Sequence, residues 1–167
     1  MTDNPLYSPE IEEAVVGDLL IDPAAFSEII LDANDFYIER HRWIFQAWQK
    51  LREKGIFPDL ATIVGQLEDD GKLKEVGEAA GVSVFLNRTP SSLNAADHVK
   101  KLKEFSNYRK VISGSEKLLK EIRNGRNRDE IQVIIDVITE ASLGEETQNE
   151  RYKIRDAAYA LQPQATA

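Results

Sequence analysis

One long apolar-periodic stretch, followed by a very short polar turn, constrains the fold of this chain most. From about Asn94 to Arg123, apolar side chains recur at the intervals of a single continuous helix. The turn Asn124-Gly125-Arg126 follows, and a second helical series runs from Ile131 to Ile138. Because the turn is so short, the two helices must fold back on each other as an antiparallel hairpin.

The part of the chain before this hairpin predicts shorter helices separated by caps and glycines. Ser8 followed by Pro9 predicts the start of the first helix, because serine caps free backbone amides and proline suits the first helical position. Gly17 interrupts this helix at a propensity cost of roughly 1 kcal/mol relative to alanine, and indicates a close helix crossing. Asp22-Pro23 repeats the cap-and-proline signal and predicts a second short helix that extends through Ile30.

A stripe of large apolar side chains between about Glu39 and Lys54 predicts the central core helix. Its members are Trp43, Ile44, Ala47, Trp48 and Leu51. The rings of Trp43, Phe45 and Trp48, with those of Phe36 and Tyr37, could also stack nucleotide bases. At helical spacing among aliphatic residues they are predicted to be core. The apolar run Val82 to Leu86 fits a strand or a helix by periodicity alone. A helical turn is predicted there, because no second strand is available to pair with it.

These elements together predict an all-α fold in three parts. Residues 8–92 are expected to form a compact helical head of about five short helices, and residues 93–143 the long antiparallel hairpin. Residues 144–167 are expected to be a linker in which Tyr152 to Leu161 suits one further short helix.

Composition is that of a globular protein and excludes several kinds of chemistry. The 167 residues, 42% hydrophobic and 30% charged, suit one ordinary domain. No run of about 18 apolar residues exists to span a bilayer, and residues 1–10 lack the regions of a signal peptide, so a cytoplasmic protein without a membrane partner is expected. The absence of cysteine excludes disulfides and thiolate zinc ligands.

No pattern in the sequence indicates catalysis or a cofactor. Gly71-Lys72 lacks the upstream glycine and following hydroxyl residue of a phosphate-binding loop. Neighbouring carboxylates such as Glu12-Glu13 do not face one another on a helix and are expected at the surface. His41 and His98 are too far apart in sequence for metal-ligand spacing, and either would transfer protons only with a partner brought near by folding. We therefore expect no enzyme activity, no cofactor and no metal.

Positive charge is segregated within an acidic chain. The net charge is −8, yet residues 98–128 carry ten basic and three acidic side chains, a net charge of +7. A long helix with solvated lysines would account for this pattern. The alternative is that the basic hairpin docks on an acidic surface, which would be phosphate, a partner protein or the head of a neighbouring copy.

A series of short motifs with fixed spacing carries a resemblance to a known family. The motifs are Glu10-x-Glu12-x-Ala14-Val15-x-Gly17-x-Leu19-Leu20-x-Asp22-Pro23, Asp35-Phe36-Tyr37-x-x-x-His41-Arg42-x-Ile44-Phe45-x-Ala47, Gly55-x-x-x-Asp59, Leu67-x-x-x-Gly71-x-Leu73-x-x-Val76-Gly77 and Thr89-Pro90. From about Ser8 to Ala141 the chain resembles the N-terminal domain of DnaB-type replicative DNA helicases. The stretch Gly77 to Gly81 departs from the family, in which a more regular sequence leads into the fifth helix.

The resemblance implies a scaffold role. In that family the domain is a helical head followed by a hairpin, pairs through the hairpins, builds a collar on the hexameric ring, and offers surface to primase and loading proteins. A RecA-like motor follows it there, and this chain ends before any such motor, so we expect part of a longer helicase or ATPase with Tyr152 to Leu161 leading to the motor. The alternative is a free-standing accessory protein. The expected function is non-catalytic oligomerisation and partner docking, with itself, primase or a loader as partners.

The hairpin is the expected interaction surface. The candidate residues are Phe105, Arg109, Ile112, Leu119, Arg123, Arg126, Ile131 and Ile138. The alternative function is a DNA-binding accessory module that uses the basic hairpin 98–128. Overall acidity ranks DNA contact below protein contact, because phosphates repel an acidic molecule.

Overall fold

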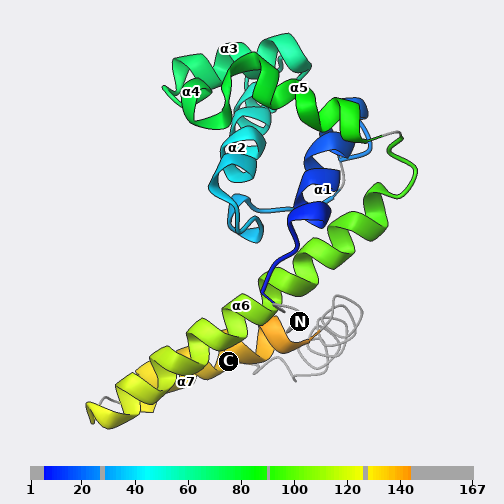
Figure 1. Ribbon diagram of the computed structural model, residues 1–167. Coiled ribbons are helices and arrows are strands. Elements are labelled where there is room, and N and C mark those ends of the chain that lie inside the picture. The colour runs from blue at the N-terminus through cyan, green and yellow to red at the C-terminus, as the bar shows by residue number, and fades with distance from the viewer. Residues whose placement is uncertain (1–5, 27–28, 90, 126–127, 144–167) are drawn as a thin grey trace, which may run out of the picture. The chain divides into compact units, whose positions relative to one another are not determined.

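Every regular element of the described chain is a helix (Figure 1). The computed structural model describes residues 6–26, 29–89, 91–125 and 128–143. The elements are α1 (Pro9–Ile21), a 3-10 helix η1 (Ala33–Asp35), α2 (Glu39–Glu53), α3 (Leu60–Asp69), α4 (Leu73–Val76), α5 (Glu78–Arg88), α6 (Ala95–Arg123) and α7 (Arg128–Ser142). The prediction of an all-α fold with a helical hairpin is confirmed.

The chain divides into two compact units, with the division inside α6. The first unit is Met1–Ser106 and the second is Asn107–Ala167. The first holds α1 to α5 and the beginning of α6, and the second holds the rest of α6 with α7. The helix predicted from Tyr152 to Leu161 lies outside the described residues.

Helix α1 begins and packs as its sequence predicts. The hydroxyl of Ser8 accepts a hydrogen bond from the backbone N–H of Ile11 at 3.3 Å, and Pro9 is the first helical residue. A Cβ built on Gly17 would lie 1.8 Å from Oγ1 of Thr89 and 2.9 Å from the carbonyl oxygen of Phe85. Glycine therefore permits the close crossing of α1 and α5, which confirms that prediction.

The core of the first unit is built around α2. The predicted stripe is largely buried, with Ile44 and Ala47 fully enclosed and Trp48 at 5% exposure. The ring of Phe45 stacks on Trp48 with centroids 5.7 Å apart. Burying each such large side chain contributes roughly 1.5–3 kcal/mol, so α2 contributes substantially to the stability of this unit. The prediction that the aromatic rings are core is confirmed for Phe36, Phe45 and Trp48, and it is wrong for Tyr37, which is 49% exposed.

The prediction of a short helix after Asp22-Pro23 is wrong. The chain makes a single turn there, in which Oδ1 of Asp22 accepts from the N–H of Ala25 at 3.2 Å. Phe26 is 2% exposed and packs against Trp48, whereas Ile30 is 84% exposed. In a helix, Phe26 and Ile30 would lie on the same face because they are four residues apart. A helix could therefore not bury Phe26 while it exposes Ile30.

The glycine-rich stretch Gly77 to Gly81 forms the corner between α4 and α5 and the first turn of α5. Gly77 ends α4 with a φ of 95°, a left-handed conformation that favours glycine. A Cβ on Gly81 would lie 2.2 Å from the carbonyl oxygen of Val76. Helix α5 then includes the run Val82 to Leu86, so the helical prediction for that run is confirmed.

Candidate protein-interaction surface

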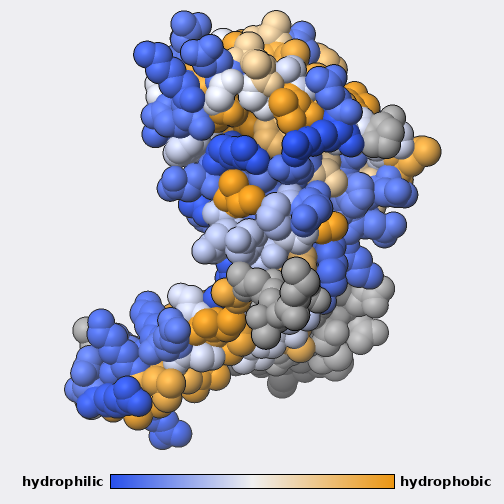
Figure 2. All heavy atoms as spheres, viewed as in Figure 1, coloured by the Kyte–Doolittle hydropathy of each residue, from blue (hydrophilic) through white to orange (hydrophobic). Residues whose placement is uncertain are grey.

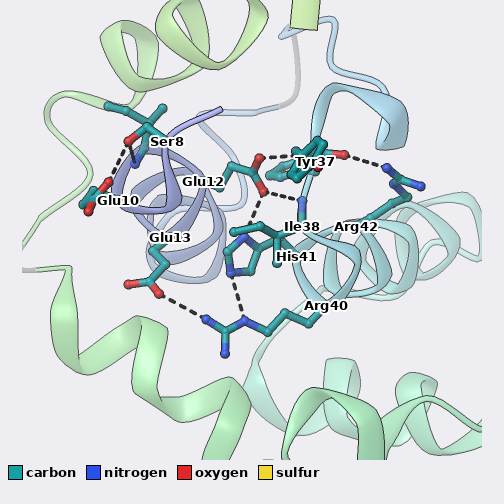
Figure 3. Close-up of polar contacts among 11 residues, drawn as sticks. Ser8, Glu10, Glu12, Glu13, Tyr37, Ile38, Arg40, His41 and Arg42 are labelled. Atoms are coloured by element: carbon teal, nitrogen blue, oxygen red, sulfur yellow. Dashed lines mark hydrogen bonds and ion pairs between the residues drawn. The ribbon is translucent and has the colours of Figure 1, made fainter. Parts of the chain in front are cut away.

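A buried carboxylate on α1 organises the start of α2 (Figure 3). The Glu12 side chain is fully buried and accepts hydrogen bonds from the backbone N–H groups of Tyr37 at 2.8 Å and Ile38 at 3.0 Å. Ile38 is the N-cap position of α2 and provides no side-chain cap. A carboxylate from a different helix therefore supplies the negative charge that a helix N-terminus favours.

His41 extends this contact into a chain of hydrogen bonds that reaches the surface. Its Nδ1 lies 3.0 Å from Oε2 of Glu12, and its Nε2 accepts from Nε of Arg40 at 3.3 Å. Nδ1 must then carry the proton that is donated to Glu12. Glu13 continues the chain through Arg40 at 3.2 Å and Arg88 at 2.7 Å. Both ring nitrogens are occupied, so the chain ties α1, α2 and α5 together.

Two further long-range contacts hold the beginning of α6 within the first unit. Nδ1 of His98 lies 2.6 Å from Oδ2 of the fully buried Asp18 on α1. Burial raises the pKa of the Asp18 carboxyl above its ordinary value, and the hydrogen bond and charge of His98 oppose that rise. The hydroxyl of Ser106 donates to Oδ1 of Asp35 at 2.6 Å, and both residues are buried. Sequence reasoning missed these pairs, whose members lie 80 and 71 residues apart.

In the second unit, α6 and α7 pack closely at one small residue. A Cβ on Gly114 would lie 2.6 Å from Cγ1 of Ile138. Ile134 of α7 is 7% exposed and belongs to the same interior. The hairpin thus uses one face of each helix for its own packing.

A second set of apolar side chains on α6 faces outward. It consists of Tyr108, Ile112, Leu119 and Ile122, between 44% and 54% exposed. We call these four residues the hairpin stripe. Their spacing follows the alternating three- and four-residue steps of a coiled-coil seam. Exposed Val133, Ile135 and Val137 add apolar surface on α7, and apolar side chains are visible along the hairpin in Figure 2.

The candidate residues named from the sequence fall into different environments. Ile112 and Leu119 belong to the hairpin stripe, and Arg123 is exposed. The half-buried members are Phe105, Arg109, Ile131 and Ile138. Arg126 lies outside the described residues. Tyr108 and Ile122 were missed, although the coiled-coil spacing of α6 contains both.

An open groove marks the surface of the first unit near the start of α2. It encloses about 640 Å³, and its wall includes Tyr7, Tyr37, Glu39, Arg40, Trp43 and Glu75. We call it the aromatic groove. The rings of Tyr7 and Tyr37 stack within it, with centroids 4.3 Å apart.

Within the described residues, no cluster of three or more histidine, aspartate or glutamate side chains is arranged to hold a metal ion. In the same part of the chain, no helix combines the length and apolarity needed to cross a membrane.

Residues 4–104 match the family model described as the DnaB-like helicase N-terminal domain. The chain belongs to this family. The match covers the whole helical head and the first turns of α6, up to residue 104. The resemblance seen in the short motifs is thereby confirmed.

Curated relatives extend the family assignment. The chain is 32% identical over 136 residues to the replicative DNA helicase DnaB of Geobacillus stearothermophilus, covering 79% of this chain and 29% of that protein. It is 37% identical over 90 residues to DnaB of Buchnera aphidicola subsp. Acyrthosiphon pisum, covering 53% of this chain and 20% of that protein. The chain therefore spans less than a third of either relative.

Solved structures share the fold. The N-terminal domain of DnaB helicase from Mycobacterium tuberculosis superposes with a TM-score of 0.73 at 22% identity, covering 79% of this chain and 99% of that one. A DnaB-like replicative helicase, studied with its interactions with primase, gives a TM-score of 0.72 at 22% identity, covering 90% of this chain and 37% of that one. The head-plus-hairpin architecture is thus the family's own.

Proposed function

We propose that this chain is a non-catalytic oligomerisation and partner-docking domain of a replicative DNA helicase, acting in ring assembly and in primase or loader binding. The single observation that supports assembly most directly is the exposed hairpin stripe. Four large apolar side chains lie on one face of α6, each about half exposed. A helix face with coiled-coil spacing is stabilised when another helix covers it.

A second copy of the chain is the proposed occupant of this face. Two hairpins related by a two-fold axis would each present the same stripe, so the contact would be self-complementary. The additional apolar residues of α7, Val133 and Val137, would widen the contact beyond a single seam. Removing this apolar surface from water is the proposed driving force for pairing.

Sedimentation equilibrium of the chain and of Ile112→Asp tests the pairing. The unsubstituted chain should form dimers or larger species, and the substitution should shift association to much higher protein concentration, because it would bury an unpaired charge in the contact. Ser113→Asp is the matched control, since Ser113 is the exposed neighbour of Ile112 and lies outside the hairpin stripe. A strict monomer at high micromolar concentration would refute the assembly role.

Primase or a helicase loader is the proposed heterologous partner. The support is the family assignment together with the solved DnaB-like relative that was studied with primase. Isothermal titration of the chain with the primase and the loader of the same organism tests this part. If neither protein gives a heat of binding or co-migrates with the chain, the docking role is refuted. The assembly role is then decided by the sedimentation experiment alone.

DNA binding by the basic hairpin is the second candidate. It is favoured by the exposed cations Lys117, Lys120 and Arg123 on α6. Affinity for single- or double-stranded DNA should then fall steeply as salt rises, because bound counterions are released. No binding at low salt would eliminate it.

A further inference from the structure

The aromatic groove has the features of a site for a positively charged side chain. The stacked rings of Tyr7 and Tyr37 form part of its wall, and Tyr37 is 49% exposed. Ring faces attract ammonium and guanidinium groups through their quadrupole. The protein already contains one such contact beside the groove, where Nζ of Lys72 lies 4.6 Å from the ring centroid of Trp43.

Charge at the rim of the groove favours the same ligand. Glu39 and Glu75 are exposed, and neither has a hydrogen bond or ion pair among the described residues. Arg40, the cation in the groove wall, is engaged by Glu13 at 3.2 Å and by Nε2 of His41 at 3.3 Å. Two carboxylates are therefore left to pair with an incoming cation.

The chain itself carries the complementary surface. Residues 1–97 hold 8 basic and 18 acidic side chains, a net charge of −10, whereas residues 98–128 have a net charge of +7. Lys117, Lys120 and Arg123 project from the last turns of α6, and all three are exposed. We call these three residues the basic end of α6.

We propose that the aromatic groove of one copy binds a lysine or arginine from the basic end of α6 of a second copy. This inference rests on the self-association proposed above and names a second contact for it. Pairing through the hairpin stripe is self-complementary and stops at two chains. A contact between two different surfaces, groove and basic end, joins one pair to the next and so permits a closed larger assembly.

Cysteine cross-linking tests the contact directly, because the chain has no cysteine of its own. Full chains carrying Glu39→Cys are mixed with full chains carrying Lys120→Cys and oxidised, so that a disulfide of the two is intermolecular. We expect about tenfold more of this product than from Glu53→Cys mixed with Lys120→Cys, because binding raises the local concentration of the two thiols. Glu53 is exposed and lies outside the groove. Equal yields from the two mixtures would overturn the proposal.

Charge exchange provides an independent readout, measured by sedimentation in the Ile112→Asp background, where the hairpin stripe is disabled. Association should weaken about tenfold in Glu39→Lys/Glu75→Lys and in Lys120→Glu/Arg123→Glu, and should recover when these two variants are mixed. Glu53→Lys/Glu68→Lys is the control for net charge and should associate as its parent does. A control that weakens equally, or groove variants that do not weaken, would refute the groove contact.

These outcomes are distinguishable from failure of the proposed function. If Ile112→Asp does not reduce association, the pairing role of the hairpin stripe fails while the cross-linking result still decides the groove. If the groove variants lose binding to primase but keep full self-association, the groove belongs to a heterologous partner and the present proposal is wrong.

Discussion

Oε2 of Glu12 on α1 and Nδ1 of His41 on α2 lie 3.0 Å apart in a fully buried contact. The same carboxylate accepts the backbone N–H groups of Tyr37 and Ile38. One side chain thus fixes both the start of α2 and its packing against α1. Because the contact is enclosed, its loss leaves hydrogen-bonding groups in the interior without partners.

Substitution of Glu12 by glutamine should therefore destabilise the first unit strongly. We expect a loss of roughly 3 kcal/mol, because the change breaks a buried pair and leaves donors that one amide oxygen satisfies poorly. Urea unfolding followed by circular dichroism measures it. Glu13→Gln is the control, since Glu13 pairs with two exposed arginines, and it should cost under about 1 kcal/mol. Equal losses in the two variants would contradict this account of Glu12.

Substitution by alanine should change the free energy of unfolding in opposite directions at Gly17 and at Gly65. Gly17→Ala places a methyl group against Thr89 and the Phe85 carbonyl, which should cost roughly 1–3 kcal/mol. Gly65 lies inside α3 with nothing within 4 Å of the added Cβ. There alanine should stabilise by up to about 1 kcal/mol through helix propensity. Thermal unfolding of both variants checks the pair, and stabilisation at Gly17 would show that α1 and α5 can separate freely.

Gly114 and Ile138 should be coupled in the hairpin. Gly114→Ala alone should weaken the packing of α6 on α7, because the new methyl group meets Cγ1 of Ile138. In the background of Ile138→Ala the obstacle is gone, and the same change should be neutral or stabilising. A double-mutant cycle in urea should therefore give a coupling of about 1 kcal/mol or more. A coupling of zero would mean that these residues do not meet.

Asp18 gives the first unit a defined pH dependence. Its pKa is raised by burial from the ordinary 3.8, against the opposing hydrogen bond and charge of His98. A raised pKa contributes stability that is fully present below the unfolded value and is lost as pH rises through the folded value. The difference in free energy of unfolding between the unsubstituted chain and Asp18→Asn should decline as pH rises from below 3.8 through the folded pKa.

The variant His98→Gln tests the opposing contribution. Without the imidazole, the pKa of Asp18 should rise further, because the favourable charge of His98 is removed while burial remains. Carbon-detected NMR titration of the Asp18 carboxyl reports the shift. A pKa of Asp18 that stays the same or falls in this variant would contradict the opposing contribution of His98.

Local sequence signals predicted the helices well where neighbouring residues decide the conformation. The Ser8 cap, the tolerance of Gly17 for a close crossing and the return of α7 along α6 all follow from short segments. Asp22-Pro23 shows where such signals fail. The cap signal was present, but burial of Phe26 against a distant helix determined a turn instead.

The polar contacts of the head were beyond sequence reasoning for a different reason. Glu12 was expected at the surface because a charged residue next to another is usually solvated. Its partners come from residues 25 to 29 positions away, and no local pattern marks them. For the hairpin, periodicity located the apolar positions but not which face of α6 is covered by α7, so Tyr108 and Ile122 were left out.

The division of the chain inside α6 determines where the chain can be shortened without unfolding the first unit. Val99 and Leu102 of α6 are 5% and 1% exposed within the core of the first unit. A chain cut at residue 92 would lose these two side chains and would also remove the partners of Asp18 and Asp35, which α6 supplies. The smallest piece able to fold as a head therefore extends through Ser106, so the root of the hairpin is part of the head's own folding unit.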